Sequence, residues 1–254
     1  MGNYKDNEDN YVHGMDWFDE DFHDSELSNY IKWRYSLIEK FIVEEVLEVG
    51  SGDRSMTKLI SQNRTGVRKL ISIEPSSTLF ELHSNKFNFP PYVSFHCLDL
   101  FSIKKETFGL FDTIVLTHVL EHIVDDRGAL RYLSDLLVPK GNLLVQVPAM
   151  KSLYSVHDEI LGHHRRYTKK SLLSIIDKNR FVVKDIWYQD TIGMLGSLYY
   201  FKIKKIKLKS ADGIQLVKSQ GKIYDQYIIP TQSFIEKYVR FPFGLSLTAI
   251  IEKK

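Results

Sequence analysis

The segment Glu48-Val49-Gly50-Ser51-Gly52 is the first in the chain whose residue types could perform chemistry. Its two glycines let the backbone approach a ligand at the turn after an apolar strand, and the N-terminus of the following helix favours anionic groups. The third glycine of the dinucleotide-binding pattern would stand at Ser55 and is absent. The Glu48 carboxylate would repel a pyrophosphate and suits an ammonium or sulfonium group. The segment therefore predicts a small-molecule site that differs from a nicotinamide-dinucleotide site.

Acidic residues end the next two apolar strands. Glu74 follows the first of them, at a spacing typical of nucleoside-binding units, and could accept both hydroxyls of a ribose. Asp99 follows the second and could accept from an adenine amino group, with Leu100 against the ring. Purely structural roles are the alternative: Glu48 would brace the loop, Glu74 would be a turn residue before Pro75, and Asp99 would cap a helix.

Alternating strands and helices must position these residues. We expect strands at 46–49, 70–73, 93–97, 113–116, 143–147, 181–187 and 246–252, and helices at 26–41, 54–62, 76–87, 126–137 and 168–179. This alternation implies a parallel sheet with helices on both faces, where ligands bind beyond the carboxyl ends of the strands. The roughly sixty residues between the sixth strand and the last are an insertion with structure of its own.

Six segments occur in a fixed order on this framework: 46–52, Ile73-Glu74-Pro75, Cys97-Leu98-Asp99, 111–115, His118-Val119-Leu120-Glu121-His122 and 137–143. In this order they resemble the motifs of class I S-adenosylmethionine-dependent methyltransferases, over residues 45–190 and the last strand. The resemblance implies a doubly wound, Rossmann-like α/β fold whose seven-stranded sheet has its last strand antiparallel. Arg54 departs from the pattern, since glycine is frequent there; its bulk would narrow the cofactor loop or pair with an acid.

The resemblance also implies S-adenosyl-L-methionine as the cofactor and S-adenosyl-L-homocysteine as the product. The glycine turn would line the methionine and ribose, with Glu48 ordering it, and Glu74 would bind the ribose hydroxyls. Thr117 and His118 would lie beneath the sulfonium group. The predicted cofactor-binding residues are Glu48, Gly50, Ser51, Gly52, Glu74, Pro75, Asp99, Leu100, Thr117 and His118.

A second group of residues, His157-Asp158 and Gly162-His163-His164-Arg165-Arg166-Tyr167, follows the fifth strand. It resembles a methyltransferase subgroup linked to glycan or glycoconjugate biosynthesis. A histidine of near-neutral pKa can take a hydroxyl proton during methyl transfer, and we predict His163 or His164 in this role, with His118 as the second choice. The predicted substrate-binding residues are His157, Arg165, Arg166 and Tyr167.

Two alternatives stand beside this interpretation of the second group. The paired arginines could hold a phosphate or carboxylate of the substrate, or they could pair with the acidic N-terminal segment, whose residues 1–26 carry nine acidic side chains. His157, Asp158, His163 and His164 have no regular metal-ligand spacing, so no metal is expected.

The chain divides into four parts on these patterns. Residues 1–44 form an N-terminal segment and helix, 45–190 the S-adenosylmethionine-binding core, 191–245 an insertion, and 246–254 the last strand of the core. We expect the N-terminal segment and the insertion to form a lid over the substrate cleft. The lysine-rich stretch 201–209 could contact an anionic membrane, although a solvated helix face is the favoured interpretation.

Composition limits the function classes. The chain has 254 residues, a formal net charge of +2 and a single cysteine, which excludes an intramolecular disulfide and favours a reducing compartment. No apolar run is long enough for a spanning helix, so we expect a cytoplasmic protein. The segment after the fourth strand lacks the Asp/Asn-Pro-Pro-Tyr/Phe motif that would grip a flipped base, which argues against DNA; an RNA surface could come only from the insertion.

The sequence therefore predicts an S-adenosylmethionine-dependent methyltransferase that acts on a small molecule, a sugar or a glycoconjugate precursor, by O-methylation. The alternatives are a non-catalytic binding or scaffold protein of the same fold and, less favoured, an NAD(P)-dependent oxidoreductase. A non-methylating enzyme that uses the same cofactor, and the oligomeric state, stay open.

Overall fold

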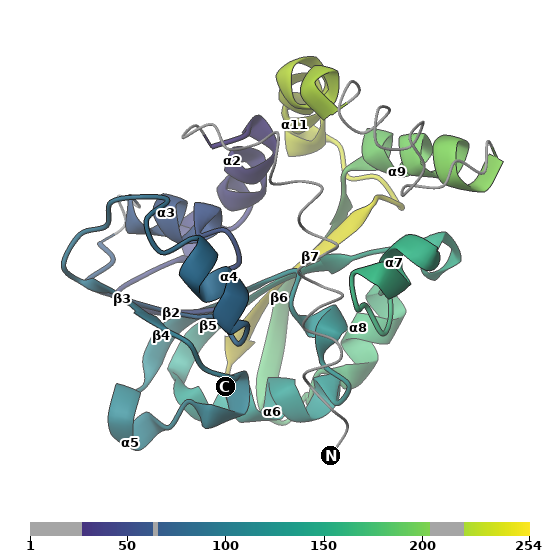
Figure 1. Cartoon of the computed structure of the whole chain (residues 1–254). Coiled ribbons are helices and arrows are strands. Elements are labelled where there is room, and N and C mark those ends of the chain that lie inside the picture. The colour runs from purple at the N-terminus through teal and green to yellow at the C-terminus, as the bar shows by residue number, and fades with distance from the viewer. Residues whose placement is uncertain (1–26, 63–65, 204–220) are drawn as a thin grey trace.

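A seven-stranded sheet of order β3-β2-β1-β4-β5-β7-β6 is the centre of the structure (Figure 1). The computed structural model describes residues 27–62, 66–203 and 221–254. The strands are β1 (Glu45–Val49), β2 (Lys69–Ile73), β3 (Val93–His96), β4 (Phe111–Thr117), β5 (Leu137–Pro148), β6 (Phe181–Gln189) and β7 (Ser246–Lys253). β7 runs antiparallel between β5 and β6, whereas β1 to β5 pair in parallel. The predicted doubly wound, Rossmann-like sheet with an antiparallel last strand is confirmed.

Helices cover both faces of this sheet, which explains why its central strands are apolar at successive positions. Adjacent β1 residues show this directly, because Val46 packs into one hydrophobic cluster and Leu47 into the other. The first cluster includes Ile60 of α3 and lies under α2 and α3. The second includes Leu133 of α6 and Leu172 of α8. All five of these side chains are buried.

The helices are shorter than the sequence predicted. They are α2 (Asn29–Ser36), α3 (Ser55–Ser61), α4 (Ser77–Leu82), α5 (Lys105–Phe108), α6 (Asp126–Leu136), α7 (Val156–Ile160), α8 (Lys169–Ile175), α9 (Thr191–Ser197) and α11 (Ile229–Tyr238). Single turns lie at η1 (Glu39–Phe41), η2 (Leu100–Ser102), η3 (Leu120–His122) and η4 (Lys151–Leu153), and π-helical turns at η5 (Leu198–Ile203) and η6 (Tyr224–Ile228).

Tertiary contacts and local side chains explain two of the early helix ends. α4 stops at Leu82, and the carbonyl groups of Phe80 and Ser84 at its end accept hydrogen bonds from the Arg54 guanidinium. α8 stops at Ile175, and the Asp177 carboxylate then accepts from the Asn179 N–H in a local turn that competes with the helix.

The buried Glu48 carboxylate braces the sheet beneath the glycine turn. It accepts hydrogen bonds from the hydroxyl groups of Thr57 on α3 and Ser72 on β2, at 2.5 and 2.7 Å. Burial raises the pKa of Glu48 to about 7, against the two hydrogen bonds, which lower it. One side chain thus ties β1, β2 and α3 together at the point where the chain leaves β1.

The insertion between β6 and β7 lies beside α2 at the carboxyl edge of the sheet (Figure 1). The Asp225 carboxylate of η6 accepts from the backbone N–H groups of Asn29 and Tyr30, at 3.0 and 2.8 Å, and so caps α2 from a distant part of the chain. Buried Asp190, which directly precedes the insertion, accepts hydrogen bonds from the Tyr224 hydroxyl and from Gln232 Nε2. These contacts join the N-terminal helix and the insertion, and their predicted role as a lid stays a prediction.

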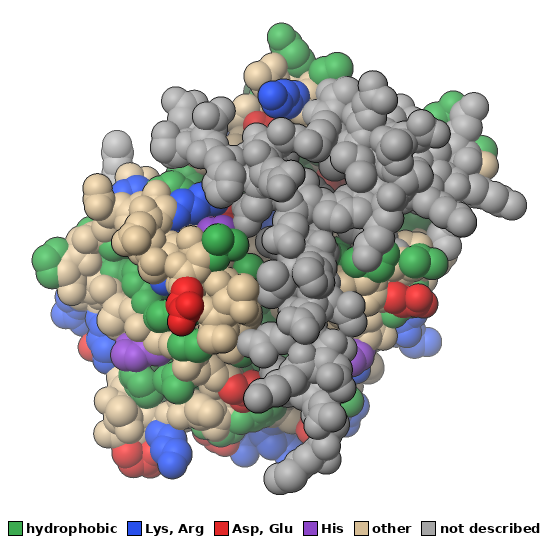
Figure 2. All heavy atoms as spheres, in the orientation of Figure 1, with side chains coloured by type: hydrophobic (Ala, Val, Ile, Leu, Met, Phe, Trp, Pro, Cys, Tyr) green, Lys and Arg blue, Asp and Glu red, His purple; other side chains and the backbone are tan. Residues whose placement is uncertain are grey.

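Exposed apolar side chains concentrate on the insertion, and Figure 2 shows hydrophobic side chains at the top of the molecule, over α11. Phe234 and Tyr238 of α11 are 66% and 69% exposed. Within the described ranges, no helix combines the length and apolarity needed to cross a membrane. The acidic segment 1–26 and most of the lysine-rich stretch 201–209 lie outside the described residues, so the predicted contacts of both segments stay predictions.

Removing the distant cap should destabilise the join between α2 and the insertion. We expect Asp225→Ala to lower the free energy of unfolding by roughly 1–2 kcal/mol, as for other lost helix caps. Asp225→Asn, which keeps one acceptor oxygen, should lose less. Urea unfolding followed by circular dichroism measures both, and equal stability of Asp225→Ala and the wild type would show that the cap contributes nothing.

Glu48 predicts a pH dependence of stability. Burial raises the pKa of Glu48 in the folded protein. The contribution of Glu48 to the free energy of unfolding is therefore fully present below about pH 4.5 and is lost as the pH rises through about 7. The shift corresponds to about 3 kcal/mol at the usual 1.4 kcal/mol per pKa unit. We expect Glu48→Gln to remove this loss.

Urea unfolding of the wild type and the variant on both sides of neutrality measures the effect. Glu106→Gln, which removes an exposed carboxylate, is the matched control. An equal loss of stability in wild type and Glu48→Gln between acidic and basic pH would contradict the prediction.

Candidate active site

The glycine turn between β1 and α3 is pinned to the end of β2. The N–H groups of Gly50 and Ser51 donate to the Ile73 carbonyl, at 2.8 and 3.0 Å. Gly50 has a φ of +76°, and a Cβ atom there would lie 2.5 Å from Cγ2 of Val119. Glycine is required at this position by the backbone conformation and by the close approach of the segment after β4.

Glu74 is oriented by the same turn. Its Oε2 accepts from the Gly52 N–H at 2.9 Å and its Oε1 from the Ser76 N–H at 3.1 Å. The side chain is buried, so its position is fixed before any ligand binds. Each carboxylate oxygen can accept more than one hydrogen bond. Glu74 therefore combines the structural role considered from the sequence with the capacity to accept ribose hydroxyls.

Asp99 and Leu100 lie at the start of η2, after β3. The Asp99 carboxylate accepts from the Phe101 N–H at 2.8 Å, which is the capping role considered from the sequence. Leu100 is buried, whereas Pro75 after β2 is exposed. Asp99 and Leu100 lie after the carboxyl end of β3, as the sequence predicted. The cofactor contacts predicted for Pro75, Asp99 and Leu100 stay predictions.

The Arg54 side chain turns toward α4 and β3. Its guanidinium donates to the carbonyl groups of Ser84 and Phe80, at 2.9 and 3.0 Å, and lies 4.1 Å from the centre of the Phe95 ring. Arg54 itself has a φ of +63°. It forms no ion pair with an acid of the described ranges, so the second of the two alternatives from the sequence, pairing with an acid, is not seen there. Arg54 therefore connects the loop between β1 and α3 to α4 and β3 through carbonyl and aromatic contacts.

Near the carboxyl ends of β4, β5 and β6, and on α2, lies a set of residues with unsatisfied polar atoms, here called the polar cluster. Each member has a buried nitrogen or oxygen atom with no hydrogen-bond partner in residues 27–62, 66–203 and 221–254. The members are Arg34 (Nε, Nη2), Thr117 (Oγ1), His118 (Nε2), Glu121 (both oxygens), Gln146 (Oε1) and Gln189 (Nε2). Buried polar groups are almost always paired, so a concentration of unpaired ones marks a site that a ligand completes.

Strand pairing brings these residues together. Thr117 of β4 is opposite Gln146 of β5, and Gln146 is opposite Thr248 of β7, whose hydroxyl donates to Gln189. Gln146 Nε2 also donates to the carbonyl of Arg34 at 3.0 Å, which connects α2 to the sheet. The polar cluster thus spans the sheet from the cofactor turn side to the base of the insertion.

His118 and Glu121 form a pair at the end of β4. His118 Nδ1 lies 3.2 Å from Glu121 Oε1, and His118 has a φ of +56°. Glu121 is fully buried, and burial raises its pKa to about 8. Burial, together with the charge of Arg34, holds the pKa of His118 well below its ordinary value. A bound sulfonium ion would favour the charged carboxylate.

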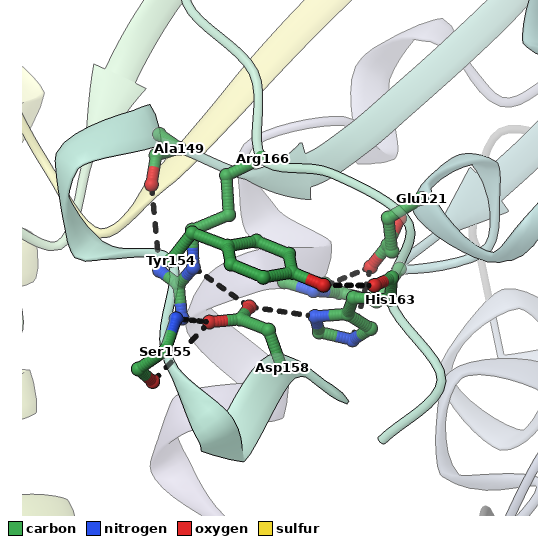
Figure 3. Close-up of polar contacts among 8 residues, drawn as sticks. Glu121, Ala149, Tyr154, Ser155, Asp158, His163 and Arg166 are labelled. Carbon is green, nitrogen blue, oxygen red and sulfur yellow. Dashed lines mark hydrogen bonds and ion pairs between the residues drawn. The ribbon is translucent and has the colours of Figure 1, made fainter. Parts of the chain in front are cut away.

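A second network surrounds His163 (Figure 3). His163 Nδ1 lies 2.8 Å from Asp158 Oδ1, which also accepts from Arg166 Nε at 2.7 Å, while Ser155 N–H donates to Asp158 Oδ2. Burial would raise the pKa of Asp158, but the hydrogen bond with His163 and the charge of Arg166 outweigh it and hold the pKa below its ordinary value. The Tyr154 hydroxyl donates to the His163 carbonyl at 2.8 Å. These contacts fix the His163 ring.

The remaining predicted substrate and catalytic residues are dispersed. Arg165 pairs with Asp126 of α6 at 2.6 Å, and the hydroxyl of buried Tyr167 donates to the same carboxylate at 2.9 Å. His164 is exposed, and the side chain of His157 is not among the described parts. Arg166 pairs with Asp158, so both arginines have acidic partners in the described part of the chain. The sequence had left open a substrate anion or the acidic N-terminal segment as their partner.

Sequence reasoning assigned no role to Arg34. This arginine lies on α2, and the charged groups of Glu121, Asp190 and Asp53 act on it. Burial lowers its pKa, and two of its nitrogens belong to the polar cluster. Such a guanidinium could hold a carboxylate. No sequence signal identified it, because the position of α2 over the sheet depends on packing alone.

The sequence indicated no separate role for Glu121, although this residue belongs to the motif at 118–122. It lies between His118 and His122 in a segment that the sequence analysis had already placed after the fourth strand. A carboxylate between two histidines at this edge of the sheet was the signal that could have identified it.

Residues 24–190 match the family described as "Methyltransferase domain". Two curated relatives, probable polyketide synthases 22 and 23 of Dictyostelium discoideum, are 22% and 21% identical over 218 residues. The matches cover 76% of this chain, and the chain spans only 9% of the length of each relative.

Solved structures share the fold. The plantazolicin methyltransferase BpumL, in complex with a pentazolic desmethylPZN analog and SAH, is 15% identical, with a TM-score of 0.56 and 98% of both chains covered. A SAM-dependent methyltransferase from Archaeoglobus fulgidus is 21% identical, with a TM-score of 0.54 over 89% of this chain and 95% of that one.

The N-methyltransferase NodS from Bradyrhizobium japonicum WM9 is 13% identical, with a TM-score of 0.51 over 88% of this chain and 92% of that one. The family match covers more than half of the chain, and the sheet order agrees with it. The chain therefore belongs to the methyltransferase-domain family, and its domain has the fold of class I S-adenosylmethionine-dependent methyltransferases.

Proposed function

We propose that the protein transfers a methyl group from S-adenosylmethionine to a hydroxyl oxygen of a small, polyhydroxylated acceptor such as a sugar or a glycoconjugate precursor. The polar cluster carries this proposal. Its unpaired atoms include a donor, Gln189 Nε2, an acceptor, Gln146 Oε1, and the hydroxyl of Thr117, which can do both. A hydroxyl group both donates and accepts, so an acceptor rich in hydroxyls can satisfy such a mixed set.

Cofactor binding follows from the turns after β1 and β2. The glycine turn approaches the methionine and ribose, and Glu74 accepts the ribose hydroxyls through oxygens whose direction the Gly52 and Ser76 N–H groups fix. Asp99 with Leu100 flanks the adenine, and Thr117 with His118 lies beneath the sulfonium. BpumL, which shares the fold, was solved with SAH, the product of such a transfer.

In this proposal the Arg34 guanidinium binds the carboxylate of the methionine part of the cofactor. Every molecule of S-adenosylmethionine that enters the site carries this carboxylate. Its unpaired Nε and Nη2 are two donors of the kind that bind a carboxylate at two points. A carboxylate at Arg34 would also compensate a buried charge that the described residues leave unpaired.

Methyl transfer is a single in-line displacement. The acceptor oxygen forms a bond to the methyl carbon as the carbon–sulfur bond breaks, and the electron pair of that bond neutralises the sulfonium. Most of the acceleration comes from holding donor and acceptor in line. The hydroxyl proton passes to His118 Nε2, which is the nitrogen left without a partner when Nδ1 faces Glu121.

The other predicted residues take secondary roles in this proposal. His163 is held by Asp158, and its Nε2 lies 4.0 Å from Glu121 Oε1, next to the proposed base rather than in its place. His164 is exposed and is the weakest of the three histidine candidates for the base. Arg165 and Tyr167 share Asp126, so any effect of these two residues on the acceptor would be indirect.

Glu74 tests the cofactor site. We expect Glu74→Ala to weaken the binding of S-adenosylhomocysteine at least tenfold in calorimetric titration, since a pair of ribose hydrogen bonds to a charged group is worth roughly 1.5–3 kcal/mol. Glu74→Gln, which keeps an acceptor oxygen, should bind with intermediate affinity. Absence of binding by the folded wild type would instead support the scaffold alternative, and NADH binding would support an oxidoreductase.

Replacing His118 tests whether this histidine takes the hydroxyl proton. On the best acceptor from a panel of sugars and sugar phosphates, His118→Ala should lower kcat by roughly 10²–10⁴-fold, a far larger effect than its effect on the affinity for S-adenosylhomocysteine. His96→Ala, which removes a histidine outside the polar cluster, is the control. An unchanged kcat in His118→Ala would contradict a base at this position and would favour an acceptor, such as an amine, that needs none.

A further inference from the structure

We propose that Glu121, His122 and His163 form a binding site for a divalent first-row transition-metal ion. One carboxylate oxygen of Glu121 and one ring nitrogen of each histidine all lie within 4.8 Å of one another. Glu121 and His122 come from the turn after β4, and His163 comes from the loop between α7 and α8. The inference goes beyond methyl transfer and does not depend on the proposed acceptor.

The donor set has the chemistry of such an ion. Two imidazoles and one carboxylate suit zinc, cobalt, manganese or iron(II), and three protein ligands leave a position open for water or substrate. Ligand atoms about 2.1 Å from a tetrahedral ion lie about 3.4 Å apart. His163 Nε2 and Glu121 Oε1 are at 4.0 Å. An ion would therefore draw the three atoms together by about 1.5 Å at most.

The Glu121 carboxylate lacks what a buried carboxylate requires. It is fully buried, and neither oxygen accepts a hydrogen bond from residues of the described ranges. His118 Nδ1 lies 3.2 Å from Oε1. An isolated buried carboxylate is highly unfavourable unless it is paired or coordinates a metal. An ion in this place would satisfy one oxygen or both.

Both histidines are held from behind, as metal-binding histidines usually are. His163 Nδ1 bonds to Asp158, whose carboxylate is itself held by Arg166 and the Ser155 N–H, and this leaves Nε2 facing Glu121 (Figure 3). The His122 ring bonds to the Gly162 backbone, and its centre lies 4.8 Å from that of His163. The rings are thus oriented in the absence of an ion.

Two guanidinium groups act on Glu121, those of Arg34 and Arg166. Arg166 is paired with Asp158, which cancels its charge locally. Arg34 also lies near Asp190 and Asp53, whose charges act on it. The local balance of charge therefore does not prevent a cation from binding between Glu121 and the two rings.

Metal binding is measured on the full chain after treatment with a chelator and removal of the chelator. We expect one Zn²⁺ per chain by calorimetric titration, and Co²⁺ should give visible ligand-field bands. His122→Ala and His163→Ala should lose this binding, and the isosteric Glu121→Gln should weaken it while preserving the fold. Asp158→Asn should weaken it by about 10–100-fold, as expected for a residue that orients a ligand.

His164→Ala is the matched control, because it removes an adjacent but exposed histidine and should keep the wild-type affinity. Circular dichroism establishes that each variant is folded. One-to-one binding that persists unchanged in both His122→Ala and His163→Ala would overturn the proposal, as would no binding by the folded wild type. S-adenosylhomocysteine binding, measured on the same samples, separates failure of the metal site from failure of the proposed function.

Discussion

The attachment of the glycine turn to the end of β2 is the constraint on which the site depends. Two consecutive N–H groups, of Gly50 and Ser51, converge on the Ile73 carbonyl, and the next glycine binds Glu74. Because β1 and β2 are parallel neighbours, this contact fixes where the chain leaves the sheet and which way the acid after β2 points. The Glu48 carboxylate secures the same junction from below through Thr57 and Ser72.

The polar cluster lies next to this junction and is built at the expense of stability. Each unpaired buried polar atom costs about 1–3 kcal/mol relative to a paired one. The apolar layers on both faces of the sheet supply the stabilisation that tolerates this loss. Concentrating unsatisfied groups at one edge is expected of a binding site, since a ligand recovers the loss when it binds. Glu121 is the member for which the loss is greatest, because it is fully buried and both of its side-chain oxygens are unpaired.

The insertion and α2 form the outer wall of this site. Asp225 caps α2, and Asp190 at the end of β6 accepts from Tyr224 and Gln232 of the insertion. Arg34 belongs to the same helix that Asp225 caps. A change in the insertion can therefore reach the polar cluster through one helix, without any movement of the sheet.

The sequence by itself determined the fold and predicted a line of residues at the carboxyl ends of the strands, whose contacts with the cofactor stay predictions. Strand periodicity, the glycine turn and the acids at strand ends are local features, and parallel strands bring their carboxyl ends to one edge whatever the loops do. Helix ends were predicted less well. Arg54 takes the carbonyl groups at the end of α4, and the Asp177 side chain forms a turn after α8, so contacts that periodicity does not encode set these ends.

Only the tertiary structure decided how the charged residues are paired. Arg165 and Tyr167 meet Asp126 across about forty residues, Arg34 joins the site from α2, and Glu121 faces His163 from another loop. Ionic and hydrogen-bonding partners are chosen by proximity in space, and the same arginine could pair with any nearby acid. Sequence patterns therefore name the chemistry that a segment can offer, while packing selects the partners that use it.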